Sequence, residues 1–167
     1  MNTDPTAIPL NLDPRTQRMT GIAIHGTTPF DVPYVSHVSG NLWTGGCTDR
    51  LILPNIFKHL ISLYPWERYR VKHKLRSESY FYLYDAGLPD TQLLEHVALL
   101  ASYCVSDGAT LIHCQAGLNR SALIAALVLM RTEGMSGSMA IDLLRRQRSP
   151  AVLCNKDFET WLHLIGA

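Results

Sequence analysis

Residues 113–121 of the chain, HCQAGLNRS, place a cysteine, a glycine, an arginine and a serine within nine positions. The preceding residues 109–114, ATLIHC, predict a short buried strand, and the mostly apolar residues 119–133 predict a helix that ends at Gly134. A loop between the carboxyl end of a strand and the start of a helix is where α/β folds commonly place ligand sites. We therefore expect a functional site at this loop.

The composition of this loop favours an anionic ligand and a cysteine nucleophile. A helix start exposes free N–H groups, Gly117 allows a tight anion-binding curve, and Arg120 can clamp two phosphate oxygens. Cys114, beside this positive field, is expected to be a thiolate, with His113 fixing the loop and the Ser121 hydroxyl donating to the sulfur. A cysteine taken alone is more often an inert core residue, so the hypothesis depends on the combination. The predicted ligand contacts are Gln115, Ala116, Gly117, Leu118, Asn119 and Arg120.

The loop matches the signature HCxxGxxR[ST], by which the chain resembles the cysteine-dependent protein tyrosine phosphatase superfamily, and within it the compact dual-specificity phosphatases. VSGNLWTGG at 38–46 resembles the first strand and turn of that family, and residues 140–162 resemble its C-terminal helical segment. The resemblance thus extends over about residues 35–165. It implies a phosphocysteine intermediate, a backbone cradle for phosphate, and no metal or other cofactor.

The resemblance also implies an aspartate general acid upstream of the loop, and two residues compete for this role. Asp90 lies in Leu88-Pro89-Asp90, which resembles a motif of the larger tyrosine phosphatases, whereas Asp85 ends an aromatic stretch as in the compact enzymes. Asp90 is also a plausible N-cap, where the helix dipole keeps a carboxylate ionised. Asp85 is therefore the preferred acid and Asp90 the alternative.

The substrate class follows from the resemblance, and several alternatives stay open. The family implies phosphotyrosine and phosphoserine/threonine in proteins or peptides, with phosphate-like anions also binding in the loop. Gly117 to Arg120 match part of the loop of RNA 5′-triphosphatases, which are the runner-up, and phosphoinositide phosphatases use the same loop with lysines that this chain lacks. A phosphate-binding module without turnover and an arsenate-reducing cysteine enzyme are further hypotheses.

The remaining elements predict an α/β fold with a central, mostly parallel sheet flanked by helices. Strands are expected within 35–46, 58–65 and 79–85, and helices over 91–107, 138–147 and 157–165. Asp90 is the expected N-cap of the first of these helices. Met139, Leu143 and Leu144 are expected to face inward from the second.

The bulk properties fit one catalytic domain over residues 21–167 after an extended or flexible arm at 1–20. The net charge of +1 gives no strong case for nucleic acid or an anionic membrane as partner. No secretory signal or membrane-spanning stretch is recognisable, and Cys47, Cys104 and Cys154 have no metal-ligand spacing, so we expect reduced core thiols and a cytoplasmic location. Arg148 and Asn155 could approach the site or buttress the last helices, and the second role is the preferred one.

Overall fold

The computed structural model describes residues 3–166, and its main sheet has five strands in the order β4-β5-β8-β6-β7. These strands are β4 (Val35–Ser39), β5 (Leu42–Gly45), β6 (His59–Ser62), β7 (Ser77–Tyr80) and β8 (Thr110–His113). The edge strand β4 runs antiparallel to β5, and the other neighbours pair in parallel. The sheet is therefore mixed but mostly parallel, as the sequence predicts.

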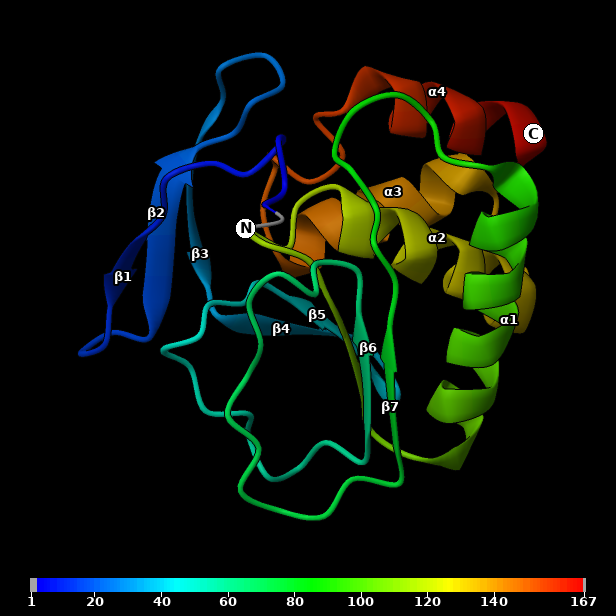
Figure 1. Ribbon diagram of the computed structural model, residues 1–167. Coiled ribbons are helices and arrows are strands. Elements are labelled where there is room, and N and C mark those ends of the chain that lie inside the picture. The colour runs from blue at the N-terminus through cyan, green and yellow to red at the C-terminus, as the bar shows by residue number, and fades with distance from the viewer. Residues whose placement is uncertain (1–2, 167) are drawn as a thin grey trace.

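A second, three-stranded antiparallel sheet lies to one side of the main sheet (Figure 1). It consists of β1 (Asn11–Asp13), β2 (Arg18–Ile22) and β3 (Pro29–Pro33). Strand β1 and the start of β2 fall within residues 1–20, for which the sequence predicts an extended arm. The residues before β1 reach the loop that follows β8, since Ile8 shares two hydrogen bonds with Gln115.

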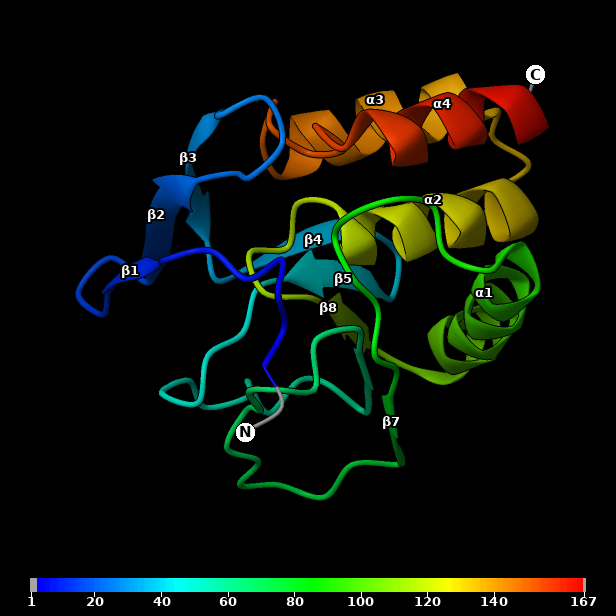
Figure 2. The ribbon, with the colours of Figure 1, turned by 45° about the horizontal axis from the view of Figure 1, so that its top comes forward.

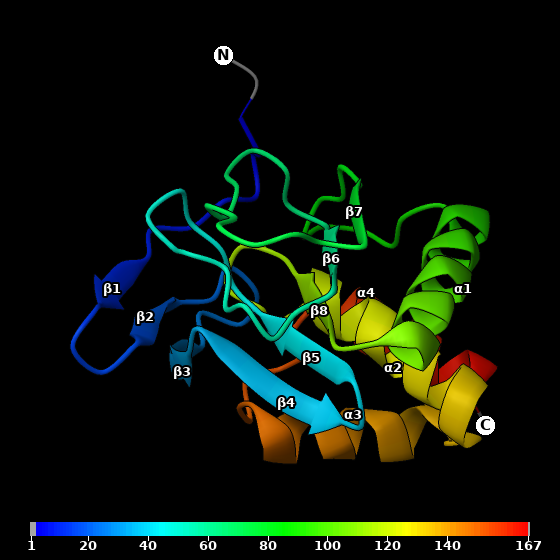
Figure 3. The same ribbon diagram turned by 90° about the horizontal axis from the view of Figure 1, so that it is seen from below.

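The four helices gather on one side of the main sheet. They are α1 (Thr91–Asp107), α2 (Arg120–Glu133), α3 (Gly137–Gln147) and α4 (Lys156–Ile165). Helix α2 lies against β5 and β8, while α1 and α3 flank it and α4 packs on α2 and α3. Figure 3 shows the strands in front of α2 and α4, and in Figure 2 the long connections after β5 and β6 run below the sheet, away from the helices.

The helix ends follow the signals in the sequence. Asp90 caps α1 by accepting hydrogen bonds from the N–H groups of Gln92 and Leu93, which confirms the predicted N-cap. Gly134, with φ of 66°, adopts the left-handed conformation that ends α2. Helix α2 is buried along residues 120–129 because it lies between the sheet and the other helices, as its apolar sequence predicts.

Two expectations about the elements are wrong. The aromatic residues 79–85 do not form a strand beyond Tyr80, because the partner β6 ends at Ser62, opposite Tyr80. Tyr82 and Tyr84 instead pack their rings against Trp66. Met139 does not face inward, since its side chain is 57% exposed and the buried residues of α3 include Leu144 but not Met139.

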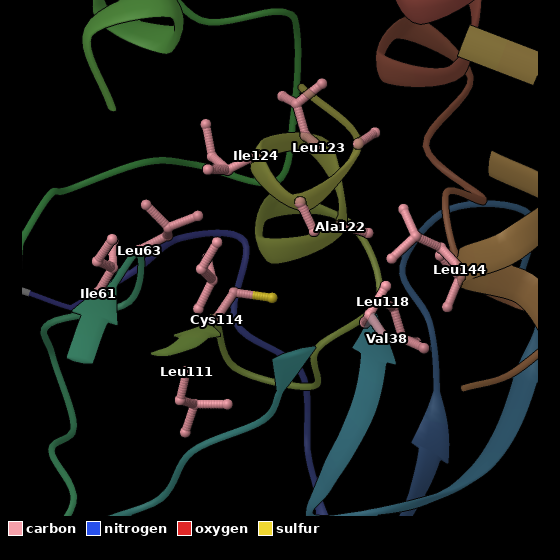
Figure 4. Close-up of a cluster of buried hydrophobic side chains, with 14 of the residues drawn as sticks. Val38, Ile61, Leu63, Leu111, Cys114, Leu118, Ala122, Leu123, Ile124 and Leu144 are labelled. Atoms are coloured by element: carbon pink, nitrogen blue, oxygen red, sulfur yellow. The ribbon is translucent and has the colours of Figure 1, made fainter. Parts of the chain in front are cut away.

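The apolar core joins the sheet to α2 around the end of β8. Figure 4 shows Leu111, Ile61 and Leu63 from the strands and their connections beside Ala122, Leu123 and Ile124 from α2. Cys114 belongs to this cluster.

Among the described residues, no helix has the length and apolar character needed to cross a membrane.

Candidate active site

Cys114 directly follows β8 and lies between the end of that strand and the first turn of α2 (Figure 4). Cys114 is 2% exposed, and its Sγ atom lies 3.3 Å from the Oγ atom of Ser121. The strand fixes the position of the sulfur because β8 is paired on both sides, with β5 and with β6. The structure thus brings together the cysteine and the serine that the sequence pairs by spacing.

The backbone of the phosphate loop, residues 114–120, turns its carbonyl groups outward. Four successive carbonyl oxygens accept hydrogen bonds from outside the loop, namely Gln115 from Cys47 N, Ala116 from Arg148 Nη2, Gly117 from Arg148 Nε, and Leu118 from Leu153 N. In a planar trans peptide, the N–H group points opposite to the carbonyl group. The N–H groups of residues 116–119 therefore point toward the inside of the loop, which is the arrangement of an anion-binding nest.

Gly117 makes this curvature possible. Its φ angle is 71°, which side-chain-bearing residues rarely adopt. A Cβ atom at this position would lie 2.5 Å from the carbonyl carbon of Gly45 and 2.7 Å from Nη2 of Arg148. A side chain here would therefore separate the loop from β5 and from the arginine that supports it.

Arg120 begins α2 and presents its guanidinium group inside the molecule. The side chain is 3% exposed, and Nη1 donates to the carbonyl oxygen of Leu83 at 3.0 Å and to Oδ2 of Asp4 at 2.6 Å. The guanidinium carbon lies 5.3 Å from the centre of the Tyr64 ring. Its Nε atom is buried and has no hydrogen-bond partner among the described residues. A tetrahedral oxyanion would supply the missing acceptor, so the arginine fits the predicted phosphate clamp.

Asp85, the predicted acid, is held by three side chains. Its Oδ2 atom accepts from Asn119 Nδ2 at 3.0 Å, and its Oδ1 atom accepts from Asn155 Nδ2 at 2.9 Å. His25 Nε2 lies 2.9 Å from the same Oδ1 atom. Asp85 also lines the cavity that Cys114 and Arg120 line. Asp90, by contrast, is exposed at the start of α1 with its Oδ1 atom engaged as the cap.

The two supporting residues predicted near the C-terminus lie against this site. Arg148 approaches the site, which is the alternative to the preferred role of buttressing the last helices, because its guanidinium donates to the carbonyl oxygens of Ala116 and Gly117. Asn155 caps α4 through Oδ1 and donates to Asp85 through Nδ2. One side chain thus connects the last helix to the predicted acid.

Burial shifts the pKa values of His113, near Cys114, and of the cysteines Cys47 and Cys154. Burial, together with the charge of Arg120, lowers the pKa of His113 to about 4, so the imidazole is neutral at neutral pH. Its Nδ1 atom lies 3.1 Å from the Cys114 carbonyl oxygen, which only accepts, so Nδ1 carries the proton. Burial also raises the pKa of the thiols of Cys47 and Cys154, which favours their protonated, unreactive forms.

The space inside the loop is small in this structure. The cavity has a volume of about 20 Å³ and is lined by Thr6, Ile8, Ala23, Ile24, Asp85, Cys114, Gln115, Ala116, Leu118, Asn119 and Arg120. A larger cavity of about 640 Å³ lies between the second sheet and the connection after β5, and none of the predicted site residues lines it. The predicted site residues therefore converge on the smaller cavity.

Three residues at this site carry no signal in the sequence. Asp4, Thr6 and His25 come from the segment before the main sheet, and they contact Arg120, the Asp85 N–H group and the Asp85 carboxyl group. Asp4 and Arg120 are 116 positions apart. No local spacing can indicate such pairs, since their proximity depends on how the N-terminal segment packs on the loop.

Comparison with known proteins relates part of this chain to phosphatases. Residues 89–166 match the family "Dual specificity phosphatase, catalytic domain". The mouse protein "Dual specificity protein phosphatase 12" is 34% identical over 83 residues, which are 47% of this chain and 24% of that protein. The yeast "Tyrosine-protein phosphatase YVH1" is 44% identical over 58 residues, 35% of this chain and 16% of that protein. The chain thus spans less than a quarter of the length of these two relatives.

The fold is also similar to that of solved phosphatase structures. The crystal structure of human DUSP28 has a TM-score of 0.68 at 19% identity, covering 80% of this chain and 93% of that one. The matched family, the curated relatives and the fold thus make this chain similar to the dual-specificity phosphatases of the cysteine-dependent protein tyrosine phosphatase superfamily.

Proposed function

We propose that this chain hydrolyses phosphate monoesters of phosphotyrosine and of phosphoserine or phosphothreonine in proteins, through a phosphocysteine intermediate. The observation that carries the proposal is the geometry of the loop. Cys114 Sγ lies 3.3 Å from Ser121 Oγ at the base of a turn whose carbonyl groups point outward. Arg120 stands beside it with a buried Nε atom that lacks an acceptor among the residues described.

In the first step, the Cys114 sulfur attacks phosphorus and forms a P–S bond while the P–O bond to the substrate breaks. The loop N–H groups and Arg120 stabilise the charge on the equatorial phosphate oxygens; removing one such donor typically costs roughly 10²–10³ in rate. Asp85 donates its proton to the leaving oxygen, so that tyrosine or serine departs as a neutral hydroxyl.

In the second step, water hydrolyses the phosphocysteine. Asp85, now ionised, accepts a proton from water as its oxygen attacks phosphorus and the P–S bond breaks. The Ser121 hydroxyl donates to the departing sulfur, which leaves as a thiolate. Inorganic phosphate is released, and the enzyme returns to its starting protonation state.

The substrate class rests on the family and on the neutral interior of the loop. Gln115, Ala116, Leu118 and Asn119 add no positive charge inside the loop, which does not favour highly anionic inositol headgroups. A phosphoprotein or phosphopeptide is therefore the proposed partner, with phosphate-like anions binding in the same loop. A cytoplasmic location is a prediction from the sequence alone.

A substrate panel tests the function. Purified chain should release phosphate from phosphotyrosine and phosphothreonine peptides, and Cys114→Ser should abolish release while preserving the unfolding transition. A phosphoinositide and a triphosphate-ended RNA complete the panel. Release from either of these without release from any phosphopeptide would refute the proposed substrate class.

The choice of acid is tested with the two aspartates as a matched pair. Asp85→Ala should cut kcat by about 10²–10⁴ for a phosphoserine peptide, flatten the basic limb of its pH profile, and cut kcat less for p-nitrophenyl phosphate, whose leaving group needs no proton. Asp90→Ala should leave both profiles unchanged, because its carboxylate caps α1. The reverse pattern would identify Asp90 as the acid.

A further inference from the structure

The N-terminal segment, defined as residues 4–8, occupies the entrance of the site described above. Asp4 Oδ2 accepts a hydrogen bond of 2.6 Å from Arg120 Nη1, and the two side chains are 0% and 3% exposed. This carboxylate occupies Nη1, one of the guanidinium donors that a phosphate oxygen could also use. Burial of both groups shows that the contact is part of the packed interior.

Two further contacts fix the segment across the loop. Thr6 Oγ1 accepts from the N–H group of Asp85 at 3.0 Å, next to the proposed acid. Gln115 uses both ends of its side-chain amide on Ile8, with Oε1 accepting from the Ile8 N–H group at 2.9 Å and Nε2 donating to the Ile8 carbonyl at 2.7 Å. These two bonds involve only main-chain atoms of residue 8, as the hydrogen bonds between neighbouring strands do.

The segment leaves too little space for a substrate. With Thr6 and Ile8 in its wall, the cavity at Cys114 has a volume of about 20 Å³. Such a space holds about one water molecule and not a phosphate group with its four oxygens. Thr6 and Ile8 thus occupy part of the space beside Cys114 that a phosphate monoester would need.

The contact with Asp4 is also weaker than the one a phosphate would make. Asp4 bonds only Nη1 of the guanidinium, and its Oδ1 atom turns back to Thr6, accepting from both the N–H and the hydroxyl group. The Nε atom of Arg120 has no acceptor within residues 3–166. A phosphate dianion can bridge Nε and a terminal nitrogen as a bidentate ligand, so it can displace a singly bonded carboxylate.

We propose that the phosphate loop and Gln115 form a binding site for an extended acidic peptide, and that residues 4–8 fill it as an internal competitor of the substrate. This inference rests on the proposed function for its effect on turnover. The ligand class is a peptide that carries an anionic group at Arg120 and presents its main chain to Gln115. A phosphopeptide substrate fits this description with its phosphate in place of the Asp4 carboxylate.

The kinetic test removes the competing charge in the full chain. Asp4→Asn should raise kcat/KM for p-nitrophenyl phosphate by roughly tenfold, because it replaces a charged hydrogen bond on Arg120 with a neutral one. The matched control is Asp13→Asn, whose carboxylate accepts hydrogen bonds from Arg15 and Thr16 within residues 3–166. The control should behave as wild type. A fall in kcat/KM for Asp4→Asn would instead make Asp4 a brace for Arg120 and overturn the proposal.

A second measurement does not depend on turnover. Hydrogen–deuterium exchange of the amides of Thr6 and Ile8, each bonded to a side-chain oxygen, should accelerate as inorganic phosphate is added to wild type. In Asp4→Asn the same amides should exchange fast without phosphate. Exchange that phosphate leaves unchanged up to high concentration would overturn the proposal. If no substrate is hydrolysed but phosphate still accelerates the exchange of these amides, the proposed function is wrong and the proposed binding site is supported.

Discussion

At the scale of single residues, His113 shows how a side chain beside the nucleophile can be important without titrating in the working range. It is 1% exposed, faces Tyr69 edge-on, and donates to the carbonyl group of Cys114. Its lowered pKa, about 4, keeps it neutral. A neutral donor fixes the end of β8 without adding positive charge to the site.

The same burial predicts a pH dependence of stability. The folded-state pKa lies below the ordinary value of 6.5, so as pH falls the unfolded chain binds this proton first. The contribution is present above about pH 6.5 and is lost as pH falls toward 4. Between pH 7.5 and 4.5, His113 alone should lower the free energy of unfolding by about 2–3 kcal/mol.

Urea unfolding of His113→Asn at the two pH values measures this contribution. On acidification from pH 7.5 to 4.5, the free energy of unfolding should fall by about 2–3 kcal/mol less in the variant than in wild type. The exposed His96 supplies the control, since His96→Asn should lose as much as wild type. Equal acid sensitivity in wild type and His113→Asn would show that His113 is protonated in the folded state.

At the scale of elements, two helix caps have different consequences for the site. Asp90 caps α1 and makes no other side-chain hydrogen bond within residues 3–166. Asn155 caps α4 through Oδ1, while its Nδ2 group donates to Asp85 Oδ1 and to the carbonyl oxygen of Ala86. The start of α4 therefore positions the proposed acid, and the start of α1 does not.

Exchanging the two cap residues separates these roles. Asn155→Asp keeps an N-cap acceptor but places a carboxylate against Asp85, so kcat should fall on the order of 10- to 100-fold through misplacement of the acid. Asp90→Asn keeps its cap and should leave both kcat and the free energy of unfolding nearly unchanged. Full activity in Asn155→Asp would show that Asp85 needs no support from α4.

At the scale of the whole molecule, Arg148 connects parts that are distant in sequence. It follows α3 and donates to the carbonyl oxygens of Ala116 and Gly117, to the carbonyl oxygen of Pro33 and to the hydroxyl of Ser36. These contacts join the helical layer, the phosphate loop and the connection between the two sheets. Burial lowers the pKa of Arg148 to about 10, so it stays charged at neutral pH.

Removing this connection should affect both stability and the loop. Arg148→Met leaves four acceptors without their charged donor, and the free energy of unfolding should fall by roughly 3 kcal/mol or more, as measured by urea titration. Phosphate affinity should fall with it, because the loop carbonyl groups are then free to turn. Arg146→Met, at an exposed position two residues earlier, should change neither quantity. An unaltered phosphate affinity in Arg148→Met would mean that the loop holds its shape alone.

Local signals made much of this protein predictable from sequence. The strand, the turn at Gly117 and the helix start at Arg120 are consecutive, so spacing alone indicates the loop. The cap at Asp90 and the left-handed Gly134 are equally local, which is why the helix boundaries agree closely. The strand expected over 79–85 is wrong because its length depends on β6, a partner that the local pattern does not describe.

What the sequence by itself determined is therefore the α/β fold class and the loop that carries Cys114 and Arg120, the proposed nucleophile and phosphate clamp. Only the tertiary structure brought His25, Asn119 and Asn155 to Asp85, and it alone placed Asp4 on Arg120. The reason is physical. Backbone geometry fixes which neighbours in the chain can share a loop, whereas contacts between distant residues depend on how the sheet, the helices and the N-terminal segment pack.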